Sequence, residues 1–185
     1  MTDITNTAAL HRAVRLTART SALLFAASQA SQAMGSRGAQ AWRPLYLGFM
    51  AAHAAHFAVV TGYAKATGGR ALFPGGRSLT DVGGWPTVAG IYTFFAALAA
   101  TGWAAGTLSA RTTPGVGVAG RIATVIIGAM FVGSYLGQLP RSGWNAVPAA
   151  IVSAAIAANL RTGIHPFDGS ARWVADPTRA NVPAP

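Results

Sequence analysis

Cysteine and glutamate are both missing from this chain of 185 residues. The absence of cysteine excludes disulfides, iron–sulfur clusters, thiolate-ligated haem and thiol catalysis. The acidic residues are Asp3, Asp81, Asp168 and Asp176, and charged residues make up only 10% of the sequence. A soluble domain of this length usually carries about 25% charged residues. This shortage, together with 52% hydrophobic residues, predicts a membrane protein.

The few charges are mostly positive, with 14 lysines and arginines and a formal net charge of +10. They fall singly or in small groups between apolar runs, as the loop charges of a membrane protein do. We therefore expect contact with the headgroups of a lipid bilayer and no nucleic-acid partner. Seven of the basic residues fall on each side of the predicted bundle, so the positive-inside rule does not decide its orientation.

Five apolar stretches follow one another at roughly the length that a bilayer requires. They predict an all-α integral membrane helical bundle of about five transmembrane helices within residues 12–160. Residues 1–11 are a polar N-terminal segment without the pattern of a cleavable signal peptide, and residues 161–185 are a polar tail that contains proline. The expected spans are 20–34, 44–63, 86–108, 121–139 and 144–160.

The first of these stretches is the weakest. It is rich in serine and alanine, and it includes Gln29 and Gln32. It is either a span, with the preceding arginines reaching the interface, or an amphipathic helix that lies in the interface. We expect its polar side chains, like others in the spans, to hydrogen-bond between helices or back to their own helix.

Tryptophan and glycine are placed as in many membrane bundles. Trp42, Trp85 and Trp144 stand at the starts of three spans, where an aromatic belt would place them. Glycines recur with three residues between them at Gly102–Gly106 and Gly133–Gly137. This spacing lets helix backbones approach closely.

The stretch from Trp42 to Tyr63 carries the most informative side chains. It contains two histidines, His53 and His56, which lie three residues apart and therefore on one face of the expected helix. Pro44 suits the first turn of that helix. Because polar groups without partners are expensive in lipid, two imidazoles at this depth require a function or a hydrogen-bond partner.

Neutral imidazole is a common ligand of haem iron, zinc and copper. Haem b fits this stretch best, because it is largely apolar and needs one or two axial donors, here His56 and His53. Zinc would need further ligands, yet no predicted span contains Asp, Glu or Cys. Copper held by these histidines with Met50 or Met130 stays open, and so does a purely structural pair that hydrogen-bonds to a neighbouring helix.

Other side chains at the ends of spans suit a cofactor or a lipid. Arg43 and Arg121 each stand at a span entrance, where they pair either with haem propionates or with phospholipid headgroups. Tyr135 with Gln138 is a candidate lining for a quinone or lipid pocket near one interface.

The residues Arg43, Leu47-Gly48-Phe49 and His56 resemble the ferric reductase-like transmembrane domain family. This family includes the haem-bearing membrane subunit of the bacterial methionine sulfoxide reductase system and the membrane part of NADPH oxidases. The resemblance implies a haem b protein of the bacterial inner membrane that exchanges electrons with a partner protein or quinone. It also implies an oxidoreductase component, here without its own flavin or nicotinamide domain.

One departure from the family affects the haem site. The family places further haem-ligating histidines on a later helix, but residues 120–135 contain none. The haem would then be five-coordinate, or its second ligand would come from Met130 or a partner chain; otherwise the site has degenerated. The alternative function is a non-catalytic structural or accessory subunit of a larger membrane complex. A transporter or lipid-modifying enzyme is a third reading, without the intramembrane acids or nucleophiles that such chemistry usually needs.

Overall fold

The computed structural model describes residues 4–34, 36–67, 84–108, 114–139 and 142–162. These residues form an all-α structure with five α-helices, as the sequence predicts. The helices are α1 (Ile4–Ala33), α2 (Ser36–Thr67), α3 (Gly84–Leu108), α4 (Pro114–Leu136) and α5 (Ala146–Thr162), and a short 3-10 helix, Gly143–Asn145, precedes α5.

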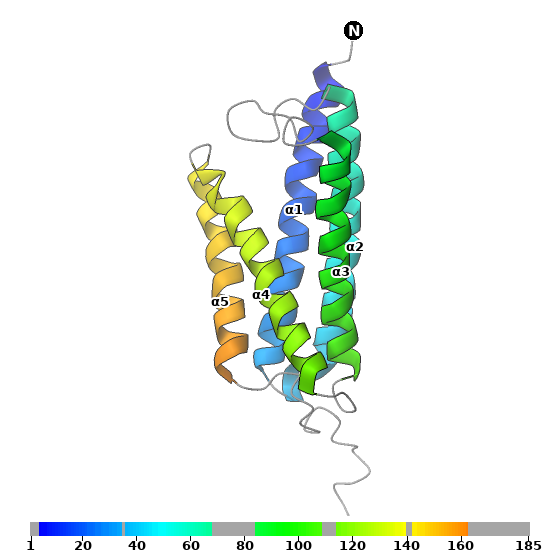
Figure 1. The fold of residues 1–185 in the computed structure, drawn as a ribbon. Helices are drawn as coiled ribbons and strands as arrows, with labels where there is room; N and C mark the ends of the chain where they lie inside the picture. The colour runs from blue at the N-terminus through cyan, green and yellow to red at the C-terminus, as the bar shows by residue number, and fades with distance from the viewer. Residues whose placement is uncertain (1–3, 35, 68–83, 109–113, 140–141, 163–185) are drawn as a thin grey trace, which may run out of the picture.

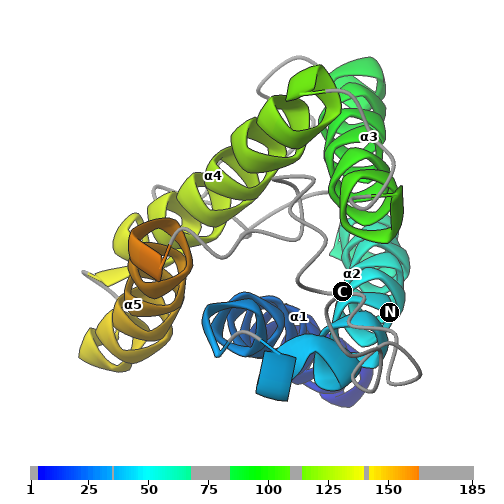
Figure 2. The ribbon, with the colours of Figure 1, turned by 90° about the horizontal axis from the view of Figure 1, so that it is seen from below.

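Consecutive helices run in opposite directions and are arranged in a ring (Figures 1 and 2). Helix α1 packs along α2, and α3 and α4 continue the ring to α5, which returns to α1. Figure 1 shows that α1 and α5 are close at the end where α5 finishes and diverge toward the end where α1 begins. The bundle is therefore more open at one end than at the other.

Within the described residues, four helical segments are long and apolar enough to cross a membrane, which suggests an integral membrane protein. They are Gln40–Ala64, Ala89–Gly106, Val118–Leu136 and Gly143–Arg161. Helix α1 is not among them, in keeping with its weak apolar pattern. It nevertheless lies lengthwise beside α2 (Figure 1), so its placement favours a helix that crosses with the bundle over one that lies in the interface.

The polar side chains of α1 have partners inside the bundle. Asn159 of α5 donates to the side-chain oxygens of Gln29 at 2.5 Å and Gln32 at 2.6 Å. All three residues are buried. The expectation of hydrogen bonds between helices is confirmed for these residues, and the contact explains how a helix with little hydropathy joins an apolar bundle.

Two expected helix starts are wrong. Helix α1 begins at Ile4, so it includes much of the segment 1–11, and α2 begins at Ser36, which places Pro44 inside the helix instead of in its first turn. An interior proline removes one backbone hydrogen bond, and here that loss does not end the helix. The tail 163–185 lies outside the described residues.

Aromatic side chains fill the space between α2 and α3. Trp42 is 3% exposed and stacks on Trp103 with ring centroids 5.6 Å apart. It is therefore a core residue, which corrects its expected place in an aromatic belt. Trp144 is 77% exposed, as a belt residue would be, while the side chain of Trp85 lies outside the described part.

The glycine pairs also differ from expectation. A Cβ at Gly102 would meet the Tyr46 hydroxyl, and one at Gly106 would meet the Trp42 ring. This pair therefore makes room for aromatic rings of α2 and does not bring two backbones together. Gly133 faces open space, so it makes no helix contact within the described residues.

Candidate functional site

A cavity of about 360 Å³ lies among the first four helices, in the half of the bundle where α1 begins. Both predicted histidines line it, and so does Met130. Its volume falls within the range of roughly 300–1,000 Å³ that is usual for small-molecule and cofactor sites. Helices α1 to α4 contribute Val14, Arg15, Ala18, Arg19, His53, His56, Val60, Ile91, Tyr92, Phe95, Met130, Phe131, Ser134 and Tyr135, and Gln138 and Asn145 complete the lining.

A hydroxyl of α1 orients the imidazole of His56. The Nδ1 atom of His56 lies 3.0 Å from Thr17 Oγ1, and Thr17 Oγ1 donates to the Ala13 carbonyl oxygen at 2.8 Å. Thr17 Oγ1 also lies 3.2 Å from the Val14 carbonyl oxygen, and the direction of its bond to His56 depends on the tautomer of the ring. A ring that donates Nδ1–H to Thr17 leaves its Nε2 lone pair for a ligand.

His53 is held in a similar way but is packed more tightly. Its Nδ1 lies 3.1 Å from Ser21 Oγ of α1. Its ring stacks on Phe95 with centroids 3.7 Å apart and meets the Phe131 ring edge-on at 5.8 Å. The two imidazoles are 5.7 Å apart. His53 therefore belongs to the aromatic wall of the cavity, and His56 is the better candidate for a metal ligand.

Helix α4 contributes sulfur and oxygen atoms to the opposite wall. Met130 and Tyr135 line the cavity, with Gln138 just beyond the helix end. The Tyr135 side chain is buried, and its hydroxyl has no hydrogen-bond partner among the described residues. A buried hydroxyl without a partner is costly, so this group favours a ligand with a polar atom in the cavity.

Two arginines that the sequence analysis did not assign to the site, Arg15 and Arg19, line the cavity from α1. Both side chains are otherwise exposed. Their spacing of four residues, which places them on one face of a helix, was the available signal. The local sequence predicts only that they anchor α1 at the membrane interface. Their contact with the cavity depends on the register of α1 against α2 and α4, which the local sequence does not determine.

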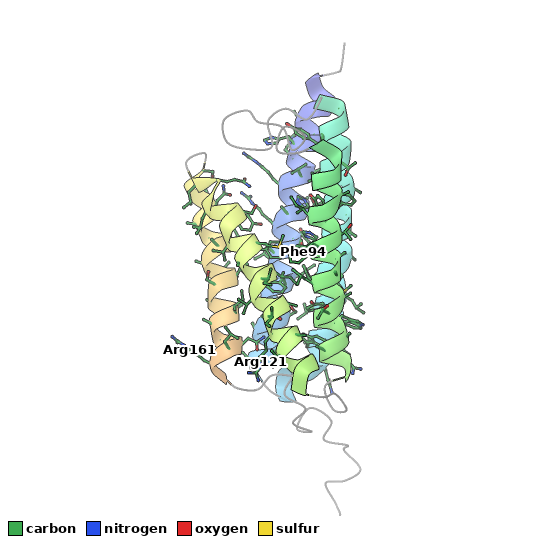
Figure 3. All side chains as sticks on the ribbon, viewed as in Figure 1. Phe94, Arg121 and Arg161 are labelled. Carbon is green, nitrogen blue, oxygen red and sulfur yellow. The ribbon has the colours of Figure 1, made fainter. Side chains whose placement is uncertain are left out.

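The structure does not bring Arg43 or Arg121 to this cavity. Arg43 is exposed and precedes His53 by ten residues, about 15 Å along the helix. Figure 3 shows Arg121 near the end of the bundle where Arg161 also lies, away from the end where α1 begins. Neither arginine is among the cavity-lining residues, and the arginines that line the cavity are Arg15 and Arg19.

The donor set fits a haem better than a bare metal ion. In the described part of the chain, no three His, Cys, Asp or Glu side chains come together as a metal cage. The cavity offers an imidazole, a thioether on the facing helix, aromatic walls and two guanidinium groups. Together they suit an apolar macrocycle with anionic substituents. No family model, curated protein or solved structure matches this chain.

Proposed function

We propose that this chain is a small integral membrane haem b-binding protein that transfers electrons. The observation that carries the proposal is the place of His56, which lines the cavity and has its Nδ1 3.0 Å from Thr17 Oγ1, so that we assign Nε2 to a ligand. A hydrogen bond from the other ring nitrogen is typical of histidines that ligate a metal. The four apolar helices support a location within a membrane.

Named side chains would hold the group. His56 would ligate the iron, and Met130 on α4 is the candidate for a second ligand. Arg15 and Arg19 would pair with the propionates, in place of the expected Arg43. His53, Phe95 and Phe131 would form an apolar wall that excludes water. A bound haem supplies one-electron chemistry, and a thioether ligand raises its potential.

The electrons would come from and go to other molecules. We propose a partner protein or a quinone as the donor and the acceptor. The resemblance of Arg43, Leu47-Gly48-Phe49 and His56 to the ferric reductase-like family supports this role, although the structure gives Arg43 no place at the cavity.

The test is an absorption spectrum of the protein purified in detergent, oxidised and reduced. We expect a Soret band that moves on reduction in the wild type and is absent from the His53→Ala/His56→Ala variant. The matched control is His11→Ala, because His11 lies on α1 and packs against Tyr63 outside the cavity. A colourless wild-type protein, expressed with adequate haem supply, would overturn the proposal.

The second candidate is a structural or accessory subunit, and one observation favours it. Both imidazoles already have hydroxyl partners at Nδ1, so they can serve simply to join α1 to α2. This candidate predicts a colourless protein that co-purifies with stoichiometric membrane partners. It also predicts that the double histidine variant lowers thermal stability without changing any spectrum.

A further inference from the structure

A second hollow, of about 550 Å³, lies between α1 and the start of α5. We call it the α1–α5 groove. Its apolar floor includes Leu23, Val147 and Ile151, and Arg15, Arg19 and Trp144 also line it. The two arginines therefore border both the groove and the His56 cavity.

The groove follows from the way α1 and α5 are joined. Asn159 holds Gln29 and Gln32 near one end of the pair, and the helices diverge toward the other end (Figure 1). The apolar side chains on the diverging faces therefore have no helix between them to pack against. In a bilayer, a lipid acyl chain would fill this apolar space between the two helices.

The charge at the groove is positive. Arg15 and Arg19 lie one helical turn apart on α1, and both are exposed. The described part of the chain contains no aspartate or glutamate, so no carboxylate within it neutralises them. Two guanidinium groups so arranged are well suited to the oxygens of a phosphate.

Trp144 indicates where Arg15 and Arg19 lie relative to the membrane surface. It is 77% exposed in the 3-10 helix that precedes α5, and exposed tryptophan prefers the level of the headgroups. The groove therefore combines an interfacial indole, two cations and an apolar floor that continues along Leu23 and Ile151.

We propose that the α1–α5 groove binds an anionic phospholipid. Arg15 and Arg19 hold its phosphate, and one acyl chain lies against Leu23, Val147 and Ile151. A zwitterionic headgroup brings its own cationic group close to the two arginines, so an anionic lipid is preferred over a zwitterionic one. The groove shares Arg15 and Arg19 with the cavity but uses no histidine, so lipid binding and haem binding are measured separately.

The test is native mass spectrometry of the purified full chain titrated with dioleoylphosphatidylglycerol or dioleoylphosphatidylcholine. We expect one tightly bound phosphatidylglycerol and weak, unsaturated binding of phosphatidylcholine. Because each basic residue near a membrane surface contributes about fivefold in affinity, Arg15→Gln/Arg19→Gln should lower phosphatidylglycerol binding by about 25-fold.

The matched control is Arg12→Gln. Arg12 is also exposed on α1 but lines neither the groove nor the cavity, so its loss should leave the bound lipid in place. A second variant, Ile151→Trp, fills the groove without changing charge and should also displace the lipid; thermal unfolding verifies that it is folded. Equal binding of the two lipids, or equal loss in Arg12→Gln and the double variant, would overturn the proposal.

Discussion

At the scale of single residues, Thr17 is the partner of His56 Nδ1. Its hydroxyl lies 3.0 Å from that nitrogen and also bonds to the Ala13 carbonyl. In the proposed site the hydroxyl oxygen accepts from Nδ1–H, which fixes the ring before any ligand arrives. Such preorganisation is what distinguishes a candidate ligand from a histidine that merely fills space.

Thr17→Val removes this acceptor while keeping the shape of the side chain. Loss of a hydrogen-bond partner of a ligating histidine typically costs 10–100-fold in metal affinity. We therefore expect haem affinity to fall by at least about tenfold. Haem titration followed by absorbance measures this effect. Thr101→Val is the control, because Thr101 is exposed on α3 and bonds only to the Ala97 carbonyl. Equal affinities in Thr17→Val and Thr101→Val would contradict the role of Thr17.

Met130→Leu tests the facing wall of the cavity. If the thioether ligates the iron, its removal lowers the midpoint potential, because a methionine ligand raises it. Potentiometric titration of the Soret band gives the value. Met50→Leu is the matched control, since Met50 is half-buried against the core and lines no part of the cavity. An unchanged potential in Met130→Leu would leave His56 as the sole protein ligand.

At the scale of helices, rings of α2 occupy the glycine positions of α3. Gly106→Ala places a methyl group against the Trp42 indole, which is itself stacked on Trp103 and cannot swing away freely. We expect a loss of about 1–3 kcal/mol in unfolding free energy, the usual cost of overpacking. Thermal unfolding in detergent measures this loss.

Gly133→Ala is the control for that substitution. It adds the same methyl group to a helix at a position with nothing within 4 Å, so helix propensity should stabilise it by up to about 1 kcal/mol. If both glycine variants changed stability equally and in the same direction, the packing of Trp42 at Gly106 would be refuted.

Buried amides join helices α1 and α5. Asn159→Leu removes the donor to both Gln29 and Gln32 and leaves their oxygens in an apolar setting. We expect destabilisation of about 1–2 kcal/mol, at the upper end for hydrogen bonds in membranes. Ser153→Leu, on the exposed face of α5, should cost less than about 0.5 kcal/mol. If Asn159→Leu left the unfolding free energy unchanged, apolar packing alone would hold α5 in place.

At the scale of the whole molecule, local pattern predicted the helices and the shared face of His53 and His56. Hydropathy and the spacing of three residues are carried by the chain itself. Helix register was not predictable in this way. It buries Trp42, brings Arg15 and Arg19 to the cavity and keeps Arg43 and Arg121 away. These outcomes depend on contacts between helices far apart in sequence.

The first helix shows the same limit more clearly. Its serines and glutamines argue against a span when it is read alone, yet Ser21, Gln29 and Gln32 are buried against partners on α2 and α5. Hydrogen bonds from α2 and α5 therefore make the burial of these polar side chains possible, and hydropathy alone does not predict this. The fold class and the number of helices could be predicted from the sequence. Which residues line the cavity could be seen only from the packing of the helices.

The central claim is that His56 Nε2 binds haem in the cavity between α1 and α4. The most direct measurement is a titration of the purified protein with ferric haem, followed at the Soret band, for the wild type, His56→Ala and Arg12→Gln. We predict saturation at one haem per chain for the wild type and Arg12→Gln, and loss of saturable binding for His56→Ala. Unsaturated binding that is the same in all three proteins would contradict the claim.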